Sequence, residues 1–189
     1  GGTPGYRLFG KVAGGAFVVA LDAGATPIGA NTTFWFNADQ NRATGYQIWG
    51  FAGGAEFNLN FDAAGRPAFF LNGAGQTPVP SVLVDWRANG NFIEYAIPLA
   101  QLQAVLGFTP TTSDLYVDVN DQVFLPNDYA NIVYTLHAET APVAGAKVLD
   151  GALSDWTAAE QIAPPATGHP GAVSVMSMST QPFSSMSAL

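Results

Sequence analysis

The sequence lacks cysteine and has little charge. Its 189 residues include no Cys, which excludes disulfide bonds and thiolate metal sites. Charged residues make up 11%, well below the usual quarter of a soluble chain, so neutral polar groups must cover much of the surface. The net charge of −8 argues against nucleic-acid binding, because only 6 Lys and Arg could neutralise phosphates. No run of roughly 18 apolar residues occurs, so no membrane-spanning helix is predicted.

Apolar residues are plentiful, at 48% of the chain, and suffice for the core of one domain. The 21 Gly and 13 Pro predict many turns. The first residues, GGTPGYRLF, lack the basic and apolar regions of a signal peptide. Because a chain without cysteine suits secretion without oxidative folding, we expect a bacterial protein that is extracellular or at the cell surface.

Apolar and polar residues alternate with a period of two along most of the chain, as is typical of strands. Turn residues at 13–15 and 89–91 join alternating runs and predict two hairpins. Residues 98–106 form a helical pattern, with Pro98 at its start and Gly107 after its end. The sequence therefore predicts an all-β fold: a two-sheet antiparallel β-sandwich, jelly-roll or immunoglobulin-like, with one short helix and an extended C-terminal segment.

Three runs, taken in order, carry a family resemblance. They are the Asp-rich turn NADQNRATGYQ, the hairpin and helix start NGNFIEYAIPLAQL, and VLDGALSDW at residues 148–156. Together they resemble family 9-like carbohydrate-binding modules, which are DOMON-like β-sandwiches. The resemblance covers most of residues 6–156 and implies a sugar-binding sandwich. In such modules the Asp-Gly…Asp-Trp run forms the opening strand, whereas here it follows the body.

The displaced motif divides the chain into three predicted parts. Residues 1–138 are the sandwich body, 139–147 a linker of small residues with Pro and Gly, and 148–189 a C-terminal extension that carries a donor-strand-like segment. Three arrangements fit this order. The chain is a piece of a tandem array, or a circular permutation whose tail folds back into its own sheet, or a subunit whose tail completes the next copy.

We favour the third arrangement, because a donated strand satisfies the edge N–H and C=O groups of a neighbour. Head-to-tail donation that does not close on itself builds a filament. The extended linker spans roughly 30 Å, which suits escape from the chain's own sheet. The expected partners are therefore other copies of the chain. The residues expected at this strand-exchange interface are Leu149, Leu153, Trp156, Val173 and Val175.

The alternative function is that of a carbohydrate-binding module in a larger secreted protein, with a polysaccharide as partner. Aromatic rings beside polar groups can stack on pyranose faces. Trp35 lies between Phe34 and Phe36, so it points to the face opposite both. Trp86, just before a hairpin turn, is expected to be the best exposed platform. The candidate sugar-binding residues are Trp35, Tyr46, Trp49 and Trp86.

Oxygen-bearing side chains gather in two turns and suggest bound Ca²⁺, the one cofactor we consider. Hard cations take six to eight oxygen ligands from carboxylates, amides and backbone carbonyls. The competing interpretation is that these residues form Asx turns, in which the side chain bonds its own backbone. The candidate ligands are Asn37, Asp39 and Asn41 in the first turn, and Asp118, Asn120, Asp121 and Asp128 in the second.

No arrangement of residues predicts catalysis, and we expect the protein not to be an enzyme. His137 and His169 are far apart, and no Ser or Asp pattern accompanies them. A carboxylate pair of Glu94 and Asp118 could be proposed for glycoside hydrolysis. Glu94, however, alternates with aromatic residues in a hairpin, which places it on a solvated strand face.

Overall fold

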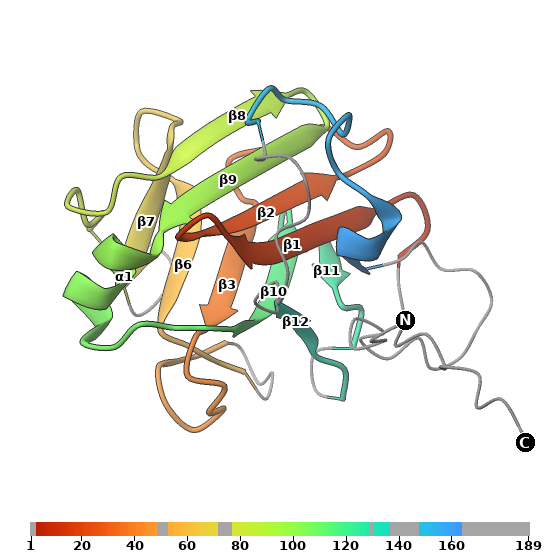
Figure 1. Cartoon of the computed structure of the whole chain (residues 1–189). Helices are drawn as coiled ribbons and strands as arrows, with labels where there is room; N and C mark the ends of the chain where they lie inside the picture. Colours follow the sequence, from red (N-terminus) through yellow and green to blue (C-terminus); the bar gives the residue numbers. More distant parts are fainter. Residues whose placement is uncertain (1–2, 49–52, 72–76, 129–130, 137–147, 164–189) are drawn as a thin grey trace, which may run out of the picture.

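The computed structural model describes residues 3–48, 53–71, 77–128, 131–136 and 148–163. Two antiparallel sheets, A and B, pack face to face in it (Figure 1). This confirms the predicted all-β sandwich with one short α-helix. None of the described helices is long and apolar enough to cross a membrane.

Sheet A contains both hairpins that the turn residues predict. Its strand order is β13-β1-β2-β9-β8. Gly14 and Gly15 have φ angles of 58° and 77° in the first turn, where a side chain would be strained. The strands are β1 (Arg7–Ala13), β2 (Ala16–Asp22), β8 (Asp85–Asn89), β9 (Phe92–Pro98) and β13 (Gln161–Ala163).

Sheet B has the order β11-β10-β3-β6-β7, and β12 also pairs with β10. A short two-stranded ribbon, β4 (Tyr46–Gln47) with β5 (Gly54–Ala55), precedes β6. The strands of sheet B are β3 (Thr33–Asn37), β6 (Phe57–Phe61), β7 (Pro67–Leu71), β10 (Ser113–Val119), β11 (Val123–Leu125) and β12 (Tyr134–Leu136).

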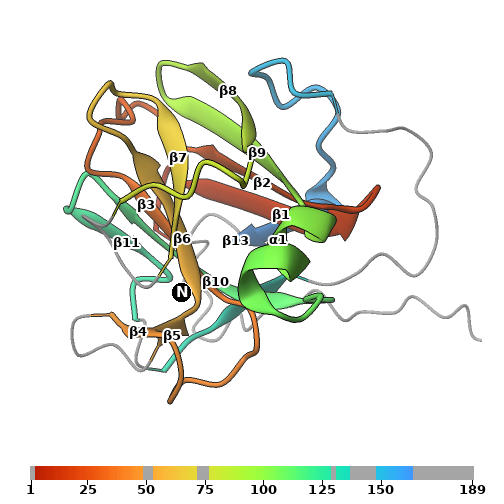
Figure 2. The same ribbon diagram turned by 90° about the vertical axis from the view of Figure 1, so that its left-hand side faces the viewer.

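The predicted helix is α1 (Leu99–Leu106), which begins directly after Pro98. Gly107 ends it in the left-handed conformation, and its N–H donates to the Gln103 carbonyl. A single 3-10 turn, η1 (Ala158–Glu160), precedes β13. Figure 2 shows residues 148–163 on the side of sheet A that faces away from sheet B.

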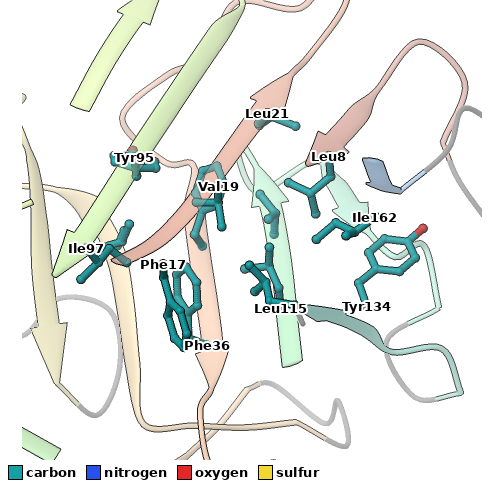
Figure 3. Packing of buried hydrophobic residues seen from close by; sticks show 14 of the residues in the cluster. Leu8, Phe17, Val19, Leu21, Phe36, Tyr95, Ile97, Leu115, Tyr134 and Ile162 are labelled. Atoms are coloured by element: carbon teal, nitrogen blue, oxygen red, sulfur yellow. The ribbon is translucent and has the colours of Figure 1, made fainter. Parts of the chain in front are cut away.

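The inward faces of the two sheets form one apolar core, as their alternation predicts (Figure 3). Phe36 stacks on Phe57 with ring centroids 4.5 Å apart and lies 6.2 Å from Phe17 of the opposite sheet. Phe57 stacks in turn on Phe69 at 4.8 Å. All four rings are at most 1% exposed, so this aromatic stack joins the sheets.

Phe36→Ala is expected to lower the free energy of unfolding by about 3 to 5 kcal/mol, because it leaves a cavity between the sheets. Leu83, whose side chain is 68% exposed, provides the control. Leu83→Ala should change stability by no more than about 0.5 kcal/mol. Urea unfolding followed by tryptophan fluorescence measures both, and equal effects would contradict the assignment of the core.

Candidate functional site

The outward face of sheet A carries a second, smaller apolar patch. Side chains alternate between the two faces of a strand, so Phe9, Val18, Ala20 and Phe92 point away from the main core. Such a patch would be unfavourable in water. Residues 148–163, called here the docked segment, cover it.

Trp156 is the main apolar anchor of the docked segment. Its side chain is 8% exposed, and its ring centroid lies 5.6 Å from that of Phe9. Its indole N–H donates to Glu94 Oε2 at 3.3 Å. The ring therefore contributes both apolar contact area and a buried hydrogen bond.

Glu94 of β9 holds the docked segment from the centre of the sheet. Its Oε1 accepts the backbone N–H of Gly151 at 2.8 Å, and the residue is 1% exposed. Burial raises the pKa of this carboxyl, and the N–H groups of Gly151 and Trp156 offset part of the rise. The prediction that Glu94 lies on a solvated face is wrong, because residues more than fifty positions later cover it.

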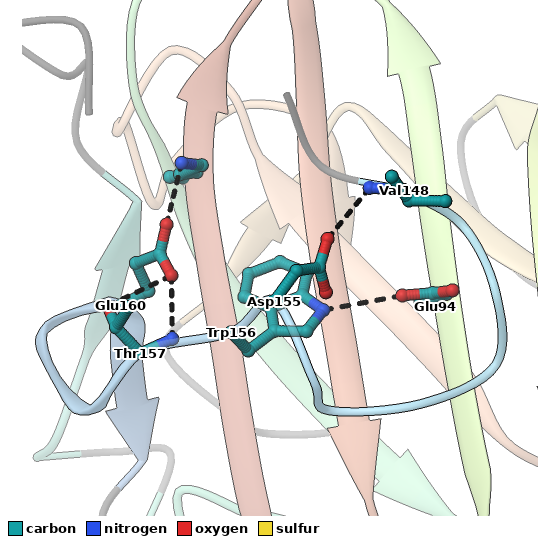
Figure 4. A network of polar contacts seen from close by, with 7 residues as sticks. Glu94, Val148, Asp155, Trp156, Thr157 and Glu160 are labelled. Atoms are coloured by element: carbon teal, nitrogen blue, oxygen red, sulfur yellow. Dashed lines mark hydrogen bonds and ion pairs between the residues drawn. The ribbon is translucent and has the colours of Figure 1, made fainter. Parts of the chain in front are cut away.

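A buried ion pair fixes the end of the docked segment to β1 (Figure 4). Lys11 Nζ lies 2.6 Å from Glu160 Oε1, and both side chains are at most 7% exposed. The other oxygen, Oε2, accepts the backbone N–H and the hydroxyl of Thr157 at 2.8 and 3.0 Å. Glu160 thus closes the capping box of η1 while it neutralises Lys11.

Local hydrogen bonds shape the docked segment before it reaches the sheet. The backbone N–H of Val148 donates to Asp155 Oδ2 at 2.7 Å, and that of Ala152 donates to Asp150 Oδ1 at 2.9 Å. Gly151 has φ 79° and lies over β8, where a Cβ atom added to it would be 3.9 Å from the Cβ of Arg87. The Asp-Gly and Asp-Trp pairs of the motif thus serve as turn residues.

β13 then adds a short strand to the edge of sheet A, antiparallel to β1. Ile162 is 4% exposed and belongs to the main core, with Leu8, Tyr134 and Leu136 (Figure 3). The docked segment therefore contributes a side chain between the two sheets. A sandwich without it would expose this part of the core.

Of the residues predicted for the strand-exchange interface, Leu153 and Trp156 pack on the same apolar patch. Trp156 is buried, while Leu149 and Leu153 are half-buried. Val173 and Val175 lie outside the described residues. The docked segment lies on the sheet of its own chain, as in the fold-back arrangement. Donation to another copy stays a prediction.

The residues of the first group of predicted metal ligands do not lie together. Asp39 Oδ1 accepts the Asn41 N–H at 2.8 Å, and Asn41 Oδ1 accepts the Ala43 N–H at 3.1 Å, so both residues make Asx turns. Asn37 is fully buried on the outward face of β3.

The residues of the second group of predicted metal ligands also bind separate partners. Asn120 Oδ1 accepts the Gly29 N–H at 2.7 Å, and Asp128 accepts the amide of Asn131. Asp118 is 8% exposed, and its Oδ2 accepts the indole N–H of Trp35 at 2.8 Å. Among the described residues, no group of three or more His, Cys, Asp or Glu side chains is arranged to hold a metal ion. Calcium binding by these residues stays a prediction.

Two of the predicted sugar-binding rings lie against each other on the outward face of sheet B. Trp35 stacks on Tyr46 with centroids 5.4 Å apart, and Trp35 is only 5% exposed. Trp86 is half-buried against the main core, so it is less exposed than the sequence predicts. Trp49 lies outside the described residues. Tyr46 thus remains as a partly accessible ring.

The two carboxylates considered for glycoside hydrolysis do not face each other. Glu94 lies on the outward face of sheet A, whereas Asp118 lies on the outward face of sheet B. The whole sandwich separates them. His137 and His169 lie outside the described residues. The expectation that the protein is not an enzyme stays a prediction.

Lys11→Met is expected to destabilise the protein by roughly 3 to 5 kcal/mol, because it leaves the Glu160 carboxylate buried without its cation. Adding Glu160→Gln should restore much of this loss, since Gln is neutral and can still accept from Thr157. Urea unfolding of the two variants measures the recovery. A double variant at least as unstable as Lys11→Met would contradict a paired role.

The free energy of unfolding should also depend on pH through the ionisation of Asp118. Burial raises its pKa to about 6 from the usual 3.8; the Trp35 N–H opposes this rise and the Asp121 charge adds to it. The protonated form is favoured in the folded state, so the stabilisation present at low pH is lost as the pH rises from about 4 to about 6. At about 1.4 kcal/mol per pKa unit, the loss is roughly 3 kcal/mol.

Asp118→Asn keeps an oxygen for Trp35 and cannot ionise. In a chelating buffer it should match the wild type below about pH 4 and be more stable above about pH 6. Thermal unfolding between pH 3 and pH 8 compares the two chains. Parallel stability curves would show that Asp118 does not titrate in this way.

No match to this chain emerges from comparison with models of protein families, with curated proteins or with solved structures. The resemblance to family 9-like carbohydrate-binding modules therefore stays a prediction, and the fold and site geometry carry the functional argument.

Proposed function

We propose that the protein is a non-catalytic, extracellular structural subunit whose docked segment binds sheet A of a neighbouring copy. The observation that supports this proposal is the set of contacts that the segment makes with its own side chains. Its anchors, Trp156 and Glu160, directly contact Phe9, Glu94 and Lys11. A segment from another copy can make the same contacts.

The tether between β12 and the docked segment allows both arrangements. Residues 137–147 include Ala, Gly, Pro and Val, and eleven residues span at most roughly 40 Å. A short tether gives the docked segment an effective concentration of about millimolar near its own sheet, so docking within one chain dominates in dilute solution. Exchange between copies then requires high local concentration, as on a crowded cell surface.

The geometry of exchange also favours an extended assembly. In an exchanged pair, the docked segment of one copy binds the outward face of sheet A of the other copy. The contact therefore joins two different surfaces. Such a heterologous contact forms an open filament unless the rotation between copies closes a ring. Each added copy would have its sheet A completed by the segment of its neighbour.

Carbohydrate binding is the second candidate function. It is supported by the stacked pair of Tyr46 and Trp35 on the outward face of sheet B. A half-buried aromatic ring can stack on one sugar unit. The platform is small, so this proposal has less support than strand exchange.

Shortening the tether tests the proposed function. Deletion of residues 139–144 leaves five tether residues, which span roughly 18 Å when extended and restrict return to the chain's own sheet. This variant should form a ladder of oligomers in light scattering after size-exclusion chromatography. The matched control replaces the same six residues with Gly and Ser and should behave as the wild type.

Trp156→Ala in the shortened chain should return the oligomers to monomers, because it removes the anchor of the exchanged segment. Two outcomes contradict the proposal. One is a shortened chain that remains monomeric up to millimolar concentration. The other is a set of oligomers that Trp156→Ala does not change.

A further inference from the structure

The outward face of sheet B contains a second buried polar group, which the docked segment does not touch. It consists of two amides and two carboxylates and is called here the amide–carboxylate cluster. Its members are Asn37, Glu56, Asn58 and Asp114.

Strand register brings these four residues together. Asn37 of β3 pairs with Asp114 of β10 on one side. On the other side, the backbone N–H of Glu56 donates to the Phe36 carbonyl at 3.0 Å, which places Glu56 beside Asn37. Asn58 follows two residues later on the same face. Directly opposite residues have Cβ atoms about 4.5 to 5.5 Å apart, and diagonal neighbours such as Asn37 and Asn58 have them about 7 to 8 Å apart, so the side chains can reach one common ligand.

Three members of the cluster are buried and Glu56 is half-buried, yet several of their polar atoms have no partner. Asn37 and Asn58 are each 0% exposed, and neither the oxygen nor the nitrogen of either amide makes a hydrogen bond. Glu56 Oε1 is likewise buried without a partner. Buried polar groups are almost always satisfied, so these unpaired amide and carboxylate atoms on neighbouring strands indicate a missing ligand.

The rest of Glu56 is held firmly. Its Oε2 accepts the N–H groups of Ala38 and Asp39 at 2.7 and 3.4 Å, while Oε1 is the buried oxygen without a donor. Burial raises the pKa of this carboxyl, and the charge of Asp39 adds to the rise.

We propose that the amide–carboxylate cluster binds a divalent cation such as Ca²⁺ through Glu56 Oε1 and the side-chain oxygens of Asn37 and Asn58. Asp114 supplies a second negative charge beside Asn37. Carboxylate and amide oxygens are the ligands that Ca²⁺ prefers. The amide nitrogens of ligating Asn residues can then turn toward the neighbouring carboxylates. This site differs from both predicted groups, from which it takes only Asn37.

Trp35 makes the site directly observable. It pairs with Asn58 across the strands and precedes Asn37 by two residues on the same face. Tb³⁺, which replaces Ca²⁺ in oxygen sites, should therefore emit when Trp35 is excited. We expect the full chain, freed of metals by a chelator, to give saturable Tb³⁺ emission that Ca²⁺ displaces, and to unfold at a higher temperature with Ca²⁺.

Glu56→Gln is the main test variant, because Gln retains an acceptor for Ala38 and removes the charge. It should weaken Tb³⁺ and Ca²⁺ binding by about tenfold or more. Asn58→Leu, of similar shape, should abolish the rise in unfolding temperature with Ca²⁺. It should not lower stability in the chelator, since it removes unsatisfied polar atoms.

Asp118→Asn is the matched control, because it removes a buried carboxylate elsewhere on the same sheet face. It should leave Tb³⁺ binding unchanged. The proposal is overturned if the wild type shows neither saturable emission nor a shift in unfolding temperature with Ca²⁺, which would leave water as the occupant. It is also overturned if Asp118→Asn abolishes binding while Glu56→Gln does not.

Discussion

The attachment of the docked segment to the outward face of sheet A is the constraint on which much of the structure depends. Lys11 and Glu94 lie on strands in the middle of an apolar surface, where an unpaired charge is costly. Glu160 neutralises the first, and the N–H groups of Gly151 and Trp156 bind the second. A segment without these groups would bury both charges unpaired, so only a segment that carries them can cover this face of the sheet at low cost.

The outward face of sheet B is also covered, but by a different part of the chain. This face carries Trp35, Tyr116 and several polar residues, and the ribbon β4–β5 packs over the two rings. Both sheets are therefore covered on their outward faces, which agrees with a chain of only 11% charged residues. The two covers differ in origin: residues between β3 and β6 cover sheet B, whereas the docked segment covers sheet A.

Period-two alternation was enough to predict the sandwich and most of its strands. It placed Phe34 and Phe36 on one face and Trp35 on the other, as observed. It could not predict what covers an outward face, because that depends on contacts between residues far apart in sequence. For this reason Glu94 was wrongly expected to be solvated.

The candidate sites also depend on contacts between residues far apart in sequence, which local spacing cannot predict. Local spacing grouped Asp39 and Asn41 with Asn37, but the first two bond their own turn. Glu56 and Asn58 lie in a run whose alternation places them on one face, and only the register of β3 with β6 and β10 brings them beside Asn37 and Asp114.

Disulfide trapping between singly substituted chains tests the central claim most directly, because the protein has no cysteine of its own. A Cβ atom added at Gly151 would lie 3.9 Å from the Cβ of Arg87, a separation that suits a disulfide. A concentrated mixture of Gly151→Cys and Arg87→Cys chains should yield the mixed dimer on mild oxidation. If that dimer is no more abundant than with Leu83→Cys in place of Arg87→Cys, the docked segment does not bind neighbouring copies.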